Sequence, residues 1–103
     1  MLLGYVRVST QEQNEERQTR ALIEKGVDPR YIYIDKQSGK DTNRPQLKSL
    51  LTYAREGDTV ITESLSRIAR NTKDLLNIMD DLTKRGIDFI SLKESIDTTT
   101  PQG

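Results

Sequence analysis

The stretch Leu2-Leu3-Gly4-Tyr5-Val6-Arg7-Val8-Ser9-Thr10, residues 2–10, decides the fold. Its apolar run is short and ends in two hydroxyl side chains, which is typical of a buried strand. Thr10 and Gln13 form the T-x-x-Q pattern of a capping box, so a helix should begin directly after this strand. The stretch therefore predicts a buried strand that turns straight into a helix.

The rest of the chain alternates helices with short apolar strands. The predicted helices run from Thr10 to about Lys25 with a stop at Gly26, from the opening Arg44-Pro45 through Ala54, and from the N-cap Asn71-Thr72 to a stop at Gly86. The further predicted strands are residues 31–34, 59–62 and 87–92. Residues 35–43 form a polar stretch typical of a loop, and residues 97–103 have the composition of a linker.

This alternation predicts an α/β fold, a three-layer sandwich with a mainly parallel sheet. Right-handed crossovers place the second strand on one side of the first and the third on the other, which gives the strand order 2-1-3-4. The gap between strands one and three is then the topological switch point, where open α/β sheets bind ligands. Arg7 to Ser9 follow strand one, and Ser66 to Arg70 follow strand three, so both segments should converge there.

Composition limits the chemistry available at this point. The chain has 103 residues, enough for one domain, and contains neither cysteine nor histidine. Thiol catalysis, disulfides and the usual zinc or iron ligands are thereby excluded, and we expect no metal and no cofactor. No apolar run reaches the roughly 20 residues that span a bilayer, so we expect no membrane partner. Because the formal net charge is zero, a phosphate site must come from a local arginine cluster.

A serine surrounded by arginines can carry out phosphoryl transfer without a metal. The guanidinium keeps its charge and bonds phosphate oxygens bidentately, so it can neutralise a phosphate that a serine hydroxyl attacks. Arg7 alternates with Ser9 along the first strand and should share its face. Arg67 and Arg70 are three residues apart, so on a helical turn both would point the same way. Arg44 lies at a helix entry beside the polar loop, from which it could swing inward.

Each of these residues also has a structural interpretation. A serine after a strand is usually a neighbour of a helix cap, and Arg67 with Arg70 could form a solvated helix face. Arg7 could pair with Asp35 at the end of the neighbouring strand. Gln18 should point toward the sheet and could be a structural amide. The convergence of these residues on one predicted location favours the chemical interpretation.

A collinear series of motifs runs along the whole chain. They are Gly4-Tyr5-Val6-Arg7-Val8-Ser9-Thr10 with Gln13 and Gln18, Asp35-x-x-Ser38-Gly39, Arg44-Pro45-x-Leu47, Gly57-Asp58, Leu65-Ser66-Arg67-Ile68-Ala69-Arg70, Glu94-x-Ile96-Asp97-Thr98 and Pro101-x-Gly103. Together they closely resemble the resolvase/invertase family of serine site-specific recombinases. The opening motif and the S-R-I-A-R block are highly specific in combination. The resemblance implies an N-terminal catalytic domain with a resolvase-like fold over residues 1–103.

The resemblance also implies an enzymatic mechanism that needs neither metal nor ATP. Ser9 would attack a DNA phosphodiester, leaving a 5′-phosphoserine link and a free 3′-hydroxyl, and reversal after strand exchange would rejoin the DNA. The implied phosphate-binding residues are Arg7, Arg67, Arg70, Gln18 and Arg44, the last delivered by a mobile loop. Tyr5, Asp35 and Ser66 would support the pocket.

Two departures from the family pattern affect this expectation. Many small resolvases carry aspartate at the position of Ser66, and serine cannot act there as a base, so an arginine, water or another group must handle the proton. The family's long dimerisation helix and DNA-binding domain should follow Gly103, so we expect the chain to be a truncated piece. The whole protein would be a DNA-bound homodimer or tetramer in the bacterial cytoplasm, on the nucleoid. Resolvase, invertase, transposase and integrase all stay open.

Two other functions compete with recombination. A non-catalytic regulatory or assembly domain of the same fold is one alternative, although Ser9 and four arginines are all retained. A receiver-like signalling module is the second, and it would need clustered acidic residues at the strand ends. This chain has Arg7 and Ser9 at the end of its first strand instead, which opposes the receiver.

Overall fold

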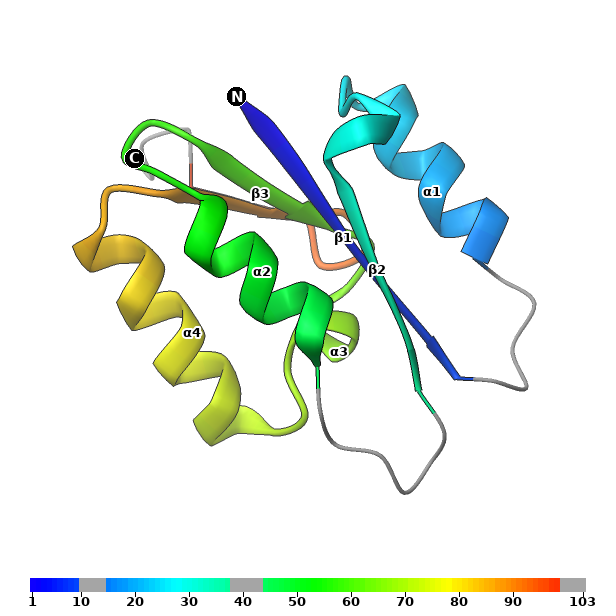
Figure 1. Cartoon of the computed structure of the whole chain (residues 1–103). Coiled ribbons are helices and arrows are strands. Elements are labelled where there is room, and N and C mark those ends of the chain that lie inside the picture. Colours follow the sequence, from blue (N-terminus) through cyan, green and yellow to red (C-terminus); the bar gives the residue numbers. More distant parts are fainter. Residues whose placement is uncertain (10–14, 38–43, 99–103) are drawn as a thin grey trace.

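The chain folds into an α/β sandwich over residues 1–9, 15–37 and 44–98, which the computed structural model describes apart from the side chains of Ser9 and Gln37. The elements in chain order are β1 (Leu2–Ser9), α1 (Glu15–Glu24), the 3-10 turn η1 (Pro29–Tyr31), β2 (Ile32–Gln37), α2 (Pro45–Tyr53), β3 (Thr59–Thr62), α3 (Leu65–Ile68), α4 (Thr72–Lys84), β4 (Asp88–Ser91) and β5 (Ile96–Asp97). Figure 1 shows α2 and α4 on one side of the sheet and α1 on the other.

The sheet has the order β2-β1-β3-β4-β5. The first four strands are parallel, which confirms the predicted order 2-1-3-4. The fifth strand was not predicted. Ile96 and Asp97 pair antiparallel with β4, so the first residue of the predicted linker, Asp97, belongs to a strand. Ser95 at φ 55° reverses the chain before this strand. Two residues carry no periodicity, which is why the sequence pattern did not indicate β5.

The sheet separates two apolar clusters. Tyr5, Leu50, Leu82 and Phe89 belong to the cluster under α2, α3 and α4. Val6, Val8, Leu22, Val27 and Ile61 form the cluster under α1. A Cβ at Gly4 would lie 2.9 Å from Leu22 Cδ1, so the helix packs directly on the backbone of β1. Alternate residues of β1 therefore face opposite layers, and Arg7 lies on the side of α3 with Tyr5.

The helix signals in the sequence are largely confirmed. Helix α1 is followed by Gly26 at φ 104°, and α2 has proline at its first turn. Asn71 caps α4 by accepting a hydrogen bond from the Asp74 N–H. The predicted capping box at residues 10–13 lies outside the described residues. No helix in the described ranges has the length and apolar character needed to cross a membrane.

Candidate active site

Arg7 joins the end of β1 to the one-turn helix α3. Its Nε donates to the carbonyl of Arg67 at 3.0 Å, and its Nη2 donates to the carbonyl of Ser66 at 2.5 Å. Arg67 returns the contact, because its Nη1 donates to the Arg7 carbonyl at 3.3 Å. The predicted convergence of these two segments is therefore present as direct contacts. It lies at the carboxyl ends of β1 and β3, where parallel sheets bind ligands.

Helix α3 is held at both ends by charged side chains. At its start, Glu94 Oε1 accepts from the Leu65 N–H at 3.1 Å and also from the Ser91 hydroxyl. At its end, the carbonyls of Ser66 and Arg67 accept from Arg7, and the carbonyl of Ile68 accepts from Arg44. The last carbonyls of a helix have no partner inside the helix, and cations at that end suit the helix dipole. The arginines therefore fix the backbone of the S-R-I-A-R block.

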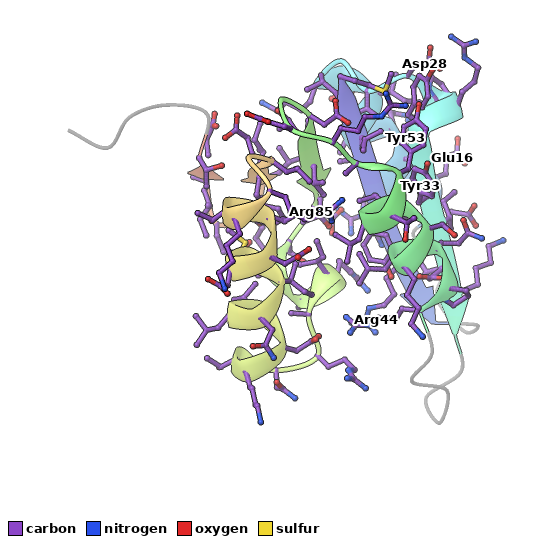
Figure 2. All side chains as sticks on the ribbon, turned by 60° about the vertical axis from the view of Figure 1, so that its left-hand side comes forward. Glu16, Asp28, Tyr33, Arg44, Tyr53 and Arg85 are labelled. Carbon is purple, nitrogen blue, oxygen red and sulfur yellow. The ribbon has the colours of Figure 1, made fainter. Side chains whose placement is uncertain are left out.

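Arg44 is the N-cap residue of α2 and is only 12% exposed. Its Nη1 donates to the Ile68 carbonyl at 2.7 Å and lies 2.9 Å from Asp74 Oδ2, while its Nη2 donates to Asp74 Oδ1 at 3.1 Å. Figure 2 shows the Arg44 side chain at the start of α2, on the side of α3. Arg44 is thus already anchored to the junction between α3 and α4.

Arg70 lies beyond the end of α3, so the prediction that it shares a helical turn with Arg67 is wrong. The helix stops at Ile68, and Ala69 is extended with φ −129° and ψ 146°. The Arg70 N–H donates to Asp74 Oδ2 at 2.9 Å, and its Nε lies 3.9 Å from the same oxygen. Contacts with α4, outside the S-R-I-A-R block itself, set the position of Arg70.

Asp74 collects these contacts and stays ionised. Burial opposes its charge, but the hydrogen bonds from Arg44 and from the Arg70 N–H, together with the two guanidinium charges, outweigh burial. The net result is that the pKa of Asp74 lies below its ordinary value. Asp74 is not among the site residues predicted from the sequence. The pattern Asn71-x-x-Asp74 at a helix start could have indicated a capping carboxylate, although not its arginine partners.

Tyr5 and Asp35 form a buried pair beneath the arginines. The Tyr5 hydroxyl donates to Asp35 Oδ2 at 2.8 Å. The same carboxylate accepts from the N–H groups of Gln46 at 3.0 Å and Leu47 at 3.1 Å, so it satisfies the first turn of α2. Asp35 therefore binds Tyr5 and α2, while Arg7 binds carbonyls of α3; the alternative Arg7–Asp35 pairing is wrong.

Gln18 and Ser9 are the two predicted site residues next to Arg7, one through a hydrogen bond and the other along β1. Gln18 is fully buried, as predicted, and its Nε2 donates to the Arg7 carbonyl at 3.4 Å. Its Oε1 has no hydrogen-bond partner within the part of the chain that is described. The backbone of Ser9 ends β1 next to Gln37. The side chain of Ser9 lies outside the description, so the nucleophile assignment stays a prediction.

Ser66 supplies its carbonyl to Arg7, while its hydroxyl lies 2.9 Å from the hydroxyl of Ser64. The position that is aspartate in many small resolvases here holds an exposed serine in contact with another serine. The side chain of Ser66 therefore makes a neutral contact and places no carboxylate beside Arg7.

The fold and the arginine cluster together define an α/β domain with a positively charged candidate site at the topological switch point. A family model described as "Resolvase, N terminal domain" matches residues 2–103. The chain belongs to this family, which confirms the resemblance.

Curated relatives and a solved structure agree with this membership. The chain is 48% identical over 103 residues to a DNA-invertase of Enterobacteria phage P7, covering 100% of the chain and 54% of the invertase. It is 48% identical over 101 residues to a resolvase of Clostridium perfringens, covering 97% and 53%. The N-terminal catalytic domain of TP901-1 integrase superposes with a TM-score of 0.76 at 33% identity, covering 96% and 82%. The chain spans about half the length of the curated relatives it matches.

Proposed function

We propose that the chain is the catalytic domain of a serine site-specific DNA recombinase with Ser9 as its nucleophile. One observation carries this proposal: hydrogen bonds join the S-R-I-A-R block to Arg7, which lies two residues before Ser9 in β1. The 48% identity, over the whole chain, to a protein named DNA-invertase supports DNA as the substrate.

The reaction exchanges one phosphodiester for another. The Ser9 oxygen forms a bond to phosphorus and loses its proton, while the bond from phosphorus to the 3′-oxygen breaks and that oxygen takes up a proton. The 5′-phosphate stays on Ser9, so the bond energy is retained and no ATP is needed. A 3′-hydroxyl of the exchanged strand then attacks phosphorus and releases Ser9.

The arginines stabilise the negative charge that develops on the phosphate. Arg7, Arg67 and Arg70 bind its oxygens, a role in which fixed, preorganised donors are most effective. Arg44, at the start of α2, binds the phosphate together with them. With serine at position 66, an arginine or water supplies the proton to the 3′-oxygen.

Gln18, Tyr5 and Asp35 act behind the arginines. Gln18 holds the backbone of Arg7 in place, because its Nε2 donates a hydrogen bond to the Arg7 carbonyl. Tyr5 and Asp35 fix the start of α2, and with it the position of Arg44.

The proposal extends to a whole protein of about twice this length, the length of the curated relatives that the chain matches. A dimerisation helix and a DNA-binding domain beyond residue 103 bring two or four copies to DNA in the bacterial cytoplasm. Domains 1–103 of these copies cut and rejoin the strands without a metal ion.

Replacing the nucleophile tests the proposal directly. In the whole protein incubated with its recombination site in the presence of a chelator, Ser9→Ala should abolish the covalent protein–DNA adduct and leave DNA binding intact, because only the attacking oxygen is removed. Adducts are counted on a denaturing gel. Ser49→Ala, which removes an exposed hydroxyl of α2, is the matched control and should keep the adduct.

A surviving adduct in Ser9→Ala contradicts the nucleophile assignment. Loss of the adduct from the unsubstituted protein on chelation contradicts the metal-free mechanism, and recovery with added divalent metal would identify the missing component.

A further inference from the structure

Asp74 contacts two of the proposed phosphate-binding arginines at once. Its Oδ2 accepts from the Arg70 N–H at 2.9 Å and lies 2.9 Å from Arg44 Nη1, and its Oδ1 accepts from Arg44 Nη2 at 3.1 Å. The carboxylate thus links the start of α2, the end of the S-R-I-A-R block and the first turn of α4. Among the described residues, Asp74 is the carboxylate that pairs with both arginines.

Three acceptor oxygens hold the Arg44 guanidinium in place. Arg44 donates to both oxygens of Asp74 and to the Ile68 carbonyl, which determines the plane of its fork. The two side chains are only 12% and 15% exposed, so water screens their attraction little. Such a pair holds a side chain in one orientation far more firmly than an exposed ion pair does.

Helix capping does not account for the Asp74 side chain. The cap of α4 is made by Asn71, whose Oδ1 accepts from the backbone N–H of Asp74. The carboxylate itself turns toward Arg44 and the backbone N–H of Arg70, which lies before the cap residue. An acidic residue that only favours the helix dipole needs neither contact.

We propose that Asp74 is a positioning residue of the phosphate site, which holds Arg44 and Arg70 in the arrangement that receives the DNA phosphate. The inference rests on the proposed function and deepens it. Asp74 touches no DNA; it acts through the two arginines. A fixed arginine loses less conformational entropy when it binds a phosphate, so the site gains affinity from a carboxylate of the same charge as its ligand.

Simple electrostatics predicts the opposite effect of removing Asp74. Asp74→Asn raises the net charge of the chain by one, and added positive charge strengthens non-specific DNA binding. The positioning role instead predicts weaker binding at the arginines. The sign of the change in affinity therefore separates the two explanations.

The test is a titration of the chain with a short mixed-sequence DNA duplex at low salt, followed by NMR of the arginine Nε–Hε groups. Asp74→Asn should raise the dissociation constant at Arg7, Arg67 and Arg70 by roughly tenfold, the effect of one charged hydrogen bond. The Nη protons of Arg44, which donate to Asp74 and to the Ile68 carbonyl, should also lose their protection from solvent exchange. Asp80→Asn makes the same charge change on the exposed side of α4 and should not weaken binding.

Asp74→Glu keeps the net charge and displaces the carboxylate by one methylene. It should weaken binding less than Asp74→Asn does, and it carries the test where Asp74→Asn does not give a folded amide spectrum. Affinity equal to or tighter than that of the unsubstituted chain in Asp74→Asn, or in Asp74→Glu where Asp74→Asn does not fold, overturns the inference alone. If the duplex leaves the arginine signals of the unsubstituted chain unmoved, the proposed function fails, and the inference with it.

Discussion

Among single residues, Tyr5 has an environment that resists ionisation. It is fully buried and donates a hydrogen bond to Asp35. Burial, that hydrogen bond and the nearby negative charge raise the pKa of the Tyr5 hydroxyl well above its ordinary value of 10.0, although the charges of Arg44 and Arg7 oppose the shift. The folded chain therefore holds the Tyr5 proton into strongly alkaline solution.

Alkaline pH should consequently destabilise the fold through Tyr5. An unfolded chain releases this proton near pH 10.0, whereas the folded chain keeps it, so the contribution of Tyr5 to stability is complete below that pH and is lost above it. Urea unfolding at a series of pH values above 9 should show a steeper loss of the free energy of unfolding for the unsubstituted chain than for Tyr5→Phe. Equal slopes would show that the Tyr5 hydroxyl has the same pKa in the folded and the unfolded chain.

The sequence named the arginines of the site but not their partners. Arg7, Arg44, Arg67 and Arg70 stand out because arginine suits phosphate. Their acceptors include backbone carbonyls, which every residue has, and Arg7 meets its acceptors across 59 and 60 residues of chain. Only the three-dimensional arrangement can select those carbonyls, and the same holds for Asp74, which lies 30 residues from Arg44.

Among the elements, α3 depends most on side chains from elsewhere. It has four residues, too few to be stable alone, and Glu94 accepts from the N–H of its first residue. The hydrogen bond from Ser91 is the main cause that lowers the pKa of Glu94, and the backbone bonds and Lys93 add to it against the opposing effect of burial.

Acid should release the start of α3. Because the pKa of Glu94 is lowered in the folded state, its contribution is present above its ordinary pKa of 4.5 and is lost as the pH falls through the lowered value. The amide chemical shift of Leu65 should therefore change at a pH below 4.5, and Glu94→Gln should remove this transition. Glu24→Gln, at an exposed position of α1, should leave it in place. A transition that persists in Glu94→Gln would assign the effect to another group.

Local patterns predicted the elements that local forces form. Gly26, Pro45 and Asn71 marked helix ends correctly because each acts on its own backbone. The end of α3 is different, since the segment contains no glycine or proline there. Its last residue is set by the contact of Arg70 with Asp74 on the next helix, which no local pattern encodes.

In the whole molecule, the order of the strands brings the residues of the site together. The charge is balanced overall, at zero, yet the parallel order of β1 and β3 brings Arg7 to the S-R-I-A-R block. The strand order could be predicted because crossover handedness leaves few choices. The positions of the guanidinium groups could not, because they depend on which carbonyls and carboxylates the packed helices present.

The Asp35 carboxylate has one more consequence, for the length of the chain segment that follows it. Since Asp35 binds the N–H groups of Gln46 and Leu47, both ends of the connection between β2 and α2 are fastened at one point. The entropy lost in closing such a connection grows only with the logarithm of its length. Four glycine and serine residues inserted between Lys40 and Asp41 should therefore lower the free energy of unfolding by less than about 1 kcal/mol.

Urea unfolding measures this cost, and the same insertion between Glu56 and Gly57 is the comparison. That turn is held by three hydrogen bonds among Arg55, Gly57, Asp58 and Gly86, so the insertion should cost more there. Equal losses at the two positions would show that Asp35 does not fasten the connection. Because Asp35 holds the two ends of this connection together, a foreign peptide such as an epitope or a reporter inserted there should leave the domain folded.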